Sequence, residues 1–210
     1  MGVDCSFTPT LSGDMTVHTL LDGCHVARSP VEIRVDPGEV DASHTTSTPR
    51  WSGSVVAGST TTVTVVCKDR FGNVCPASGG IEGFASLAAG KRKIPAKTID
   101  NNDGTCTLML VCNEAGRHAL SVRATQTDIV GSPLLLEVVS APVCASQCSA
   151  EGRGLEPGLQ AGQSASFVVR TADQYGNERR SGGERVLVTV QGPAPVATSV
   201  HDNADGTYAV

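Results

Sequence analysis

The chain has 210 residues, a net charge of −5 and only 3% aromatic residues. The acidic balance argues against nucleic acid as a partner, because proteins that bind nucleic acid usually present a basic face. With so few large rings the core must be built from Val, Leu, Ile and Ala, and 23 Gly and 11 Pro residues indicate frequent turns, so the composition favours an all-β protein.

Residues 1–36 are expected to form the last strands of a β-sandwich. Gly13–His18 and Val31–Val35 alternate apolar and polar residues as half-buried strands do, and Leu21-Asp22-Gly23 has the residues of a turn. Residues 37–49 lack periodicity and are rich in Ser, Thr, Asp, Pro and Gly. This composition predicts a linker before the next domain.

Residues 50–140 are predicted to form a complete sandwich. Its clearest strands are Thr61–Cys67, Thr105–Cys112, Gly116–Ala124 and Pro133–Val139. A further strand is expected between Ile81 and Lys97, although Ala and Gly dilute its pattern. Phe71-Gly72-Asn73 predicts a tight turn, since Gly and Asn tolerate a positive φ.

Residues 141–147, which include Pro142, are predicted to be a second linker. Residues 148–210 are expected to form the N-terminal two-thirds of a third sandwich. Within them, Ala165–Arg170 and Arg185–Gly192 have the pattern of strands. No segment of the sequence has the periodicity of an amphipathic helix.

Two motifs recur at about the length of one small domain. Asp-x-aromatic-Gly-Asn begins at Asp69 and again at Asp173, 104 residues later. Asp-Asn-x-Asp-Gly begins at Asp100 and again at Asp202, 102 residues later. A repeat of this length indicates an array of domains. The chain is therefore expected to be a fragment that holds the tail of one repeat, a complete second repeat and most of a third.

Other motifs accompany these two. They are a Gly-x-Gly-Leu opening at Gly152, a Gly-Gly pair at Gly182, a Gly-Pro pair at Gly192 and Gly-Ser-Pro at Gly131. Together the motifs resemble the filamin-type immunoglobulin repeat family, the filamin/ABP280 repeats. The middle copy departs from the pattern, with Trp51 for the opening Leu and Cys106 for the Tyr of the Asp-Gly-Thr-Tyr sequence. The resemblance implies tandem immunoglobulin-like antiparallel β-sandwiches.

The expected fold is thus all-β, with about 45% or more of the residues in strands and almost no helix. The side chains expected in the cores share the apolar phase of their predicted strands. They are Val63, Val65, Leu108, Leu110, Phe167 and Val169.

The sequence predicts neither an enzyme nor a metal or cofactor site. Asp100–Gly104 looks like a calcium loop, but with Gly104 at position 6 of an EF-hand, positions 1 and 12 fall on Ile99 and Leu110, which cannot bind a cation. A structural turn is the better interpretation. The Asp of each Asp-x-aromatic-Gly-Asn motif is expected to accept backbone N–H groups of its own turn. The five His residues share no ligand spacing with the cysteines.

Three of the eight cysteines lie on the apolar phase of strands in the middle copy, Cys67, Cys106 and Cys112. Two interpretations remain open. One is a single cross-strand disulfide among these residues, and the other is a set of buried reduced thiols that act as small hydrophobic residues.

The third copy is predicted to offer an edge for a partner peptide. Its strand over 186–191 should lie at an open edge, because Pro193 and Pro195 shorten the next strand, and an open edge offers unpaired N–H and C=O groups. The candidate residues are Val186, Val188, Val190, Gln191, Val196, Thr198 and Val200. The alternative is an edge that binds nothing and is guarded by Arg185 and Gln191. The resemblance implies that such binding occurs between strands C and D of the repeat.

The leading functional hypothesis is a non-catalytic scaffold or spacer that binds proteins, with a link to the actin cytoskeleton and a cytoplasmic location. One alternative is the ectodomain of a membrane-anchored, gamete-type adhesion protein at the cell surface. Another is a targeting module of a larger ubiquitin ligase. Protein partners are expected, nucleic acid is not, and a membrane is expected only if regions outside this chain carry an anchor.

Overall fold

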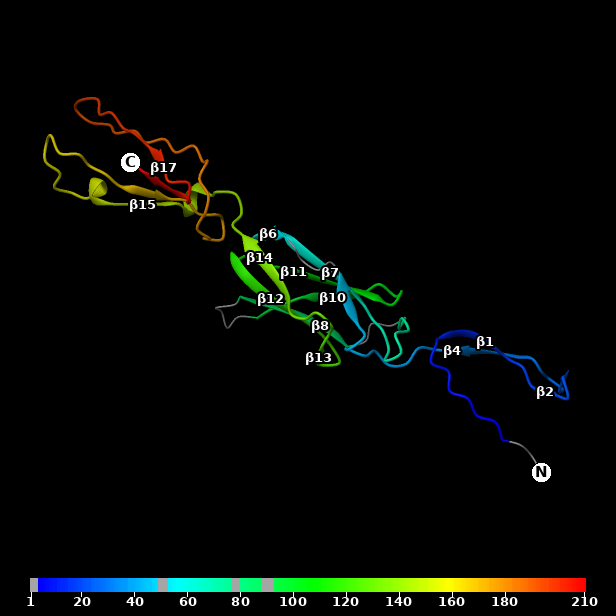
Figure 1. Ribbon diagram of the computed structural model, residues 1–210. Coiled ribbons are helices and arrows are strands. Elements are labelled where there is room, and N and C mark those ends of the chain that lie inside the picture. The colour runs from blue at the N-terminus through cyan, green and yellow to red at the C-terminus, as the bar shows by residue number, and fades with distance from the viewer. Residues whose placement is uncertain (1–3, 49–52, 77–79, 88–92) are drawn as a thin grey trace.

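The computed structural model describes residues 4–48, 53–76, 80–87 and 93–210. Within these ranges the regular elements are strands and two 3₁₀ turns, η1 (Ala145–Gln147) and η2 (Arg153–Leu155). No helix of this described part is long and apolar enough to cross a membrane. Three units follow one another along an elongated molecule, with the two termini at opposite ends (Figure 1). The near absence of helix confirms the all-β prediction.

The middle repeat is a sandwich of two sheets. One sheet has the order β10 (Lys97–Asp100), β11 (Thr105–Val111), β7 (Thr60–Val66) and β5 (Thr46–Thr48). The other has the order β6 (Ser54–Val56), β14 (Leu134–Val139), β12 (Gly116–Ala124), β8 (Ile81–Leu87) and β9 (Lys93–Pro95), with β13 (Thr127–Asp128) beside β12. These neighbours pair antiparallel except β14 and β6, which are parallel.

Buried and more exposed side chains alternate along the strands of this repeat, and the buried ones form its core. Val63 and Val65 of β7 and Leu108 of β11 are fully buried, and Leu110 is 3% exposed. They pack in one cluster with Leu120 and with other apolar residues of the second sheet. Because successive residues of a strand point to opposite faces, every second residue of β7, β11, β12 and β14 faces this core. Four of the six predicted core residues are thus confirmed.

The predicted linker over 37–49 is wrong in its C-terminal part. Thr46–Thr48 form β5, which pairs with β7. Thr45 is fully buried, and its hydroxyl accepts the backbone N–H of Lys68 at 3.2 Å. Ser and Thr can enter a core when their hydroxyls are hydrogen-bonded, and composition alone does not reveal that pairing. The expected start of the repeat at residue 50 lies outside the described residues, as does Trp51.

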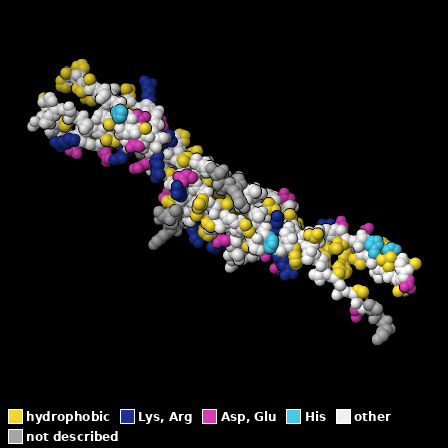
Figure 2. All heavy atoms as spheres, viewed as in Figure 1, with side chains coloured by type: hydrophobic (Ala, Val, Ile, Leu, Met, Phe, Trp, Pro, Cys, Tyr) yellow, Lys and Arg dark blue, Asp and Glu magenta, His cyan; other side chains and the backbone are white. Residues whose placement is uncertain are grey.

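The first unit contains the two expected strands. β1 (Gly13–Val17) pairs with β4 (Val31–Val35), and the short strands β2 (Leu20–Leu21) and β3 (Cys24–His25) join at the tip. The register of β1 and β4 is that of β12 and β14 shifted by 103 residues, because Gly13 opposes Val35 as Gly116 opposes Val138. Hydrophobic side chains gather on the visible surface of this unit (Figure 2).

The third unit is one sheet with the order β15 (Ser149–Glu151), β16 (Val168–Arg170), β18 (Thr207–Ala209) and β17 (His201–Asp202). Two predictions are wrong here. Residues 185–192 form no strand, and Phe167 and Val169 are half-buried rather than buried. A strand requires a ladder partner, and burial of β16 requires a second sheet such as the one that covers β7. Neither occurs among the described residues of this unit, so the strand content stays below the expected 45%.

Replacement of Leu108 by Ala should cost the middle repeat about 2–5 kcal/mol of unfolding free energy, because a fully buried Leu leaves a cavity. The measurement is urea unfolding followed through the amide NMR signals of β11. The matched control is Leu135→Ala on β14, where the side chain is 74% exposed and the expected loss is under about 0.5 kcal/mol. Equal losses at the two positions would contradict the assignment of the core.

Candidate functional site

Each Asp-x-aromatic-Gly-Asn motif folds into a tight turn around its aspartate. Asp69 Oδ1 accepts the backbone N–H groups of Phe71 and Asn73, both at 2.9 Å. Asp173 Oδ1 makes the same two bonds in its own turn, also at 2.9 Å. Gly72 has a φ of 87°, which favours glycine at that position of the turn. The expected role of the aspartates in holding their turns is therefore confirmed.

The second carboxylate oxygen binds the segment that leads into the repeat. Asp69 Oδ2 accepts the backbone N–H of Gly38 at 2.9 Å, and Asp173 Oδ2 accepts that of Ala141 at 2.8 Å. In each motif the same oxygen also accepts the side-chain amide of the motif's Asn at 2.8 Å. The carboxylate therefore joins the turn to the entering chain.

The Asn of each motif reaches the preceding repeat. Asn73 Nδ2 donates to the carbonyl of Thr10 at 2.9 Å, and Asn73 Oδ1 accepts the backbone N–H of Ser12 at 3.0 Å. These contacts link the middle repeat to the loop that precedes β1.

Asn177 makes the equivalent bonds one repeat later. It donates to the carbonyl of Asn113 at 2.7 Å and accepts the N–H of Ala115 at 2.8 Å, in the loop that precedes β12. We call the Asp and Asn of one motif, with the main-chain groups that they bind, a junction clasp. The first clasp holds Asp69 and Asn73, and the second holds Asp173 and Asn177. Sequence reasoning assigned these residues only to their own turns.

Both clasp aspartates are buried, Asp69 at 1% exposure and Asp173 at 0%. Burial by itself would raise the pKa of Asp69, but hydrogen bonds from the Asn73 side chain and from backbone amides outweigh it and hold the pKa well below its ordinary value. The pKa of Asp173 is lowered in the same way, with burial opposed by bonds from Asn177 and from the amide of Ala141. The carboxylates are therefore ionised at neutral pH.

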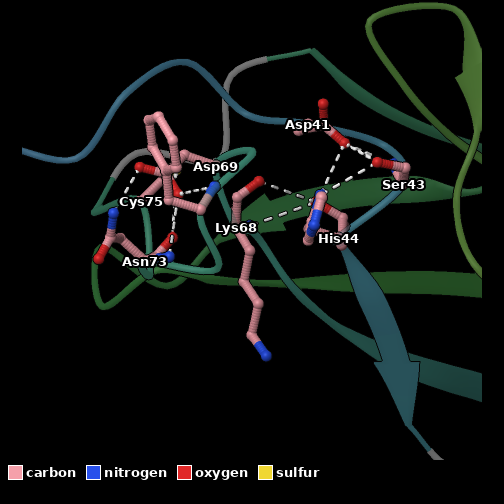
Figure 3. A network of polar contacts seen from close by, with 9 residues as sticks. Asp41, Ser43, His44, Lys68, Asp69, Asn73 and Cys75 are labelled. Atoms are coloured by element: carbon pink, nitrogen blue, oxygen red, sulfur yellow. Dashed lines mark hydrogen bonds and ion pairs between the residues drawn. The ribbon is translucent and has the colours of Figure 1, made fainter. Parts of the chain in front are cut away.

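A Ser, a His and an Asp come together beside the first clasp (Figure 3). His44 Nδ1 lies 3.2 Å from Asp41 Oδ1 and 3.0 Å from Ser43 Oγ. Both contacts fall on the same ring nitrogen, whereas a catalytic triad uses one nitrogen for the carboxylate and the other for the nucleophile. Asp41 also accepts the N–H of Ser43 at 2.7 Å, so the group stabilises a local turn. Among the described residues, no three His, Cys, Asp or Glu side chains are placed to hold a metal ion.

The structure brings two of the three predicted cysteines together. Cys106 lies on β11, and Cys67 directly follows the adjacent strand β7. Both residues are fully buried and their thiols interact. Cys112 directly follows β11, six residues beyond Cys106 and about 20 Å from it. All eight cysteines are free thiols in this structure, and a disulfide between Cys67 and Cys106 stays a prediction. Burial, followed by interaction with Cys67, raises the pKa of Cys106 to about 12.

The predicted peptide edge lies on two segments of the third repeat, 186–191 and 196–200. Val186 and Val188 are half-buried and alternate with the exposed Leu187 and Thr189, which is the two-sided pattern of a strand. The hydroxyl of Thr198 donates to the carbonyl of Val188 at 2.9 Å and holds the two segments side by side. The remaining candidate residues are exposed and are Val190, Gln191, Val196 and Val200.

The corresponding edge of the middle repeat is covered. There β9 pairs antiparallel with β8, and Phe84 opposes Pro95. Lys93 and Arg123 place their cationic groups over the ring of Phe84, at 4.4 and 5.2 Å from its centroid. The paired residues of β8 have no free ladder positions on this side, so the two repeats differ at this edge.

Comparison with known proteins places these features in a family context. Residues 34–135 and 142–210 match the family described as Filamin/ABP280 repeat. Filamin-A of Drosophila melanogaster is 31% identical over 136 residues, which cover 64% of this chain and 6% of that protein. The E3 ubiquitin-protein ligase TRIM45 of Bos taurus is 41% identical over 69 residues, 31% of this chain and 12% of the ligase. The chain therefore spans only a small part of these relatives.

Solved structures share the fold. The Escherichia coli adhesin FdeC aligns with a TM-score of 0.56 and 18% identity over 94% of this chain and 64% of its own. Invasin, described as a bacterial integrin-binding protein, aligns with a TM-score of 0.53 and 18% identity over 94% of this chain and 39% of its own. At such identity these likenesses show the immunoglobulin-like fold alone.

Native alkylation should separate the cysteines by burial. At pH 8, a pKa of about 12 leaves Cys106 with roughly a thousandfold less thiolate than an ordinary thiol. The exposed Cys5 and Cys24 should therefore react with iodoacetamide first, and Cys67 and Cys106 only after unfolding. Peptide mass spectrometry gives the order in which the cysteines are alkylated.

A non-reducing peptide map after air oxidation tests the predicted disulfide, which would appear as linked peptides of Cys67 and Cys106.

Acid should weaken the repeats through the clasp carboxylates. Because the folded pKa of Asp173 lies below its unfolded value, its stabilisation is present above about pH 4 and is lost as the pH falls through the folded pKa. Asp173→Asn should lower the melting temperature at pH 7 and flatten its decrease below pH 4. The exposed Asp14→Asn is the control for removal of one charge. An unchanged acid profile for Asp173→Asn would contradict this role.

Proposed function

The chain belongs to the Filamin/ABP280 repeat family, and from that premise we propose that it is a non-catalytic scaffold that holds partner proteins along an array of repeats. Repeats of this family are protein-interaction modules. The polar side chains described above support the proposal through their structural roles, since they stabilise turns and the junctions between repeats.

The observation that carries the proposal is the edge of the third repeat. No strand pairs with residues 186–191 within the described part of the chain, so their N–H and C=O groups can bind an extended peptide as an added strand. Val186 and Val188 point to the half-buried side, beside the segment that carries Val196 and Val200. Alternate apolar side chains of the guest would fit between these valines.

We further propose a cytoplasmic location and a link to the actin cytoskeleton. The relation to filamins supports this assignment. In such a protein this stretch would act as a spacer between other domains. A cell-surface role is favoured by no specific observation, because the bacterial adhesins resemble the chain only in fold.

A second candidate is the targeting module of a ubiquitin ligase. The observation that favours it is the higher identity of a 69-residue stretch to TRIM45, 41% against 31% over 136 residues for the filamin. A module of this kind would use the same edge to select the protein to be modified. The domains elsewhere in the full protein separate the two candidates, since a ligase needs a catalytic domain and a cytoskeletal scaffold needs an actin-binding one.

The edge can be tested by NMR titration of the labelled chain with a synthetic 12-residue peptide of alternating Val and Thr. Amide shifts should be confined to residues 186–200. Val188→Asp should weaken peptide binding at least about tenfold, or 1.4 kcal/mol, because it places a charge among the valines that would contact the apolar side chains of the guest. Leu187→Asp is the matched control on the opposite side, 77% exposed, and should bind as the parent does.

Shifts centred on residues 152–155 or on the repeat junctions would rule this edge out. Equal losses of peptide affinity in Leu187→Asp and Val188→Asp would also count against this edge. The peptide would then respond to the added charge and not to the side of the segment that carries it.

A further inference from the structure

The two junction clasps make the same bonds between different sequences. The groups gripped in the first clasp and in the second are related by a constant shift of 103 residues, Thr10 with Asn113, Ser12 with Ala115 and Gly38 with Ala141. Every gripped group is a backbone N–H or C=O. Since all residues except Pro carry both groups, the clasp does not depend on the side chains of the preceding repeat.

The chemistry of the clasp requires an asparagine. Its amide donates through Nδ2 to the preceding repeat and to the aspartate, and it accepts an N–H through Oδ1. Asp in its place would have no donor for the carbonyl of Asn113, and Ala would have neither group. The aspartate also fixes which way the amide points, because a flipped amide would place its oxygen against the carboxylate.

The entering segments are tied to the same place. The N–H of Asp41 donates to the carbonyl of Lys68 at 2.7 Å, and the N–H of Cys144 donates to the carbonyl of Ala172 at 2.8 Å. The residues before them, Val40 and Val143, form isolated antiparallel bridges with the clasp aspartates. The segments at both junctions are therefore hydrogen-bonded to the ends of the sheets.

The second junction carries additional support. His118 is 1% exposed and its Nε2 bonds the carbonyl of Glu114 at 2.8 Å, inside the loop that Asn177 grips. The ring of Tyr175 lies against Gly58 so closely that a Cβ there would collide with it. Arg179 Nη1 donates to the carbonyl of Ala141 at 3.1 Å. The contact of Tyr175 with Gly58 crosses between the two repeats. The bonds of His118 and Arg179 brace the loop and the entering segment that the clasp binds.

We propose that the Asp-x-aromatic-Gly-Asn motif is an inter-repeat clasp that sets one fixed orientation between each repeat and the one before it. Its partner is the main chain of the preceding repeat, in the loop before the strand that starts at Gly13 or Gly116. An array clasped in this way is a stiff rod, and the sites on its repeats keep set distances and directions. This property is independent of the peptide edge.

The test is the relative orientation of the middle and third repeats, measured by residual dipolar couplings on the full 210-residue chain. In the parent chain one alignment tensor should fit both repeats. In Asn177→Ala the two repeats should require separate tensors. Asn203→Ala is the matched control, since Asn203 bonds only Thr207 within its own turn and the single tensor should persist.

Amide shifts of β16 and β18 show whether the third repeat of the variant is still folded. Should Asn177→Ala unfold it, the first junction provides the same test through Asn73→Ala, because the middle repeat has a complete core of its own. Separate tensors in the clasp variant, with intact repeats, support the proposal. Separate tensors in the parent chain, or a single tensor in the clasp variant, overturn it.

Discussion

A buried carboxylate in the turn after β7, and another in the turn after β16, joins each turn to the segment that enters the repeat. Leaving an unpaired carboxylate in a dry environment is costly, so Asp69 and Asp173 must be surrounded by donors. Some of these donors belong to the motif's own turn, and one belongs to the segment entering the repeat. One carboxylate thus joins the turn to the entering segment, and the Asn that it binds contacts the preceding repeat.

The proposed scaffold role draws on two different parts of this arrangement. The clasps use main-chain partners and impose order along the array, whereas the edges of the sheets differ from repeat to repeat. In the middle repeat β9 occupies the edge beside β8. In the third repeat the segment over 196–200, which the structure describes in full, is hydrogen-bonded to Val188 through the hydroxyl of Thr198 and forms no strand pairing with it. A scaffold needs both properties, a regular frame and sites that are not all alike.

Among the described residues of the middle repeat, the buried hydrophobic cluster contains no aromatic residue. Val, Leu, Ile and Ala supply most of its buried side chains, and Cys67, Cys75, Cys106 and Cys112 fill the remaining positions. A small thiol packs as a hydrophobic residue, and its burial suppresses the thiolate form that would make it reactive. In the third repeat the positions of Cys67 and Cys106 hold Thr171 and Tyr208. The Thr171 hydroxyl donates to the carbonyl of Gly206, and the Tyr208 hydroxyl accepts the N–H of Glu184.

The sequence by itself determined the repeat length, the positions of most strands and the turns at Asp69 and Asp100, because these depend on alternation and on side chains within a few residues. The edge that Pro193 and Pro195 suggested over Val186 to Val200 stays a prediction. Only the tertiary structure decided that Thr46–Thr48 is a strand, that residues 185–192 are not, and that Phe167 stays half-buried. Each of these depends on a partner strand far away in the chain. The clasps show this dependence most clearly, since Asn73 and Asn177 bind carbonyl groups 63 and 64 residues earlier in the chain. A local sequence pattern does not predict which distant backbone group a side-chain amide will bind.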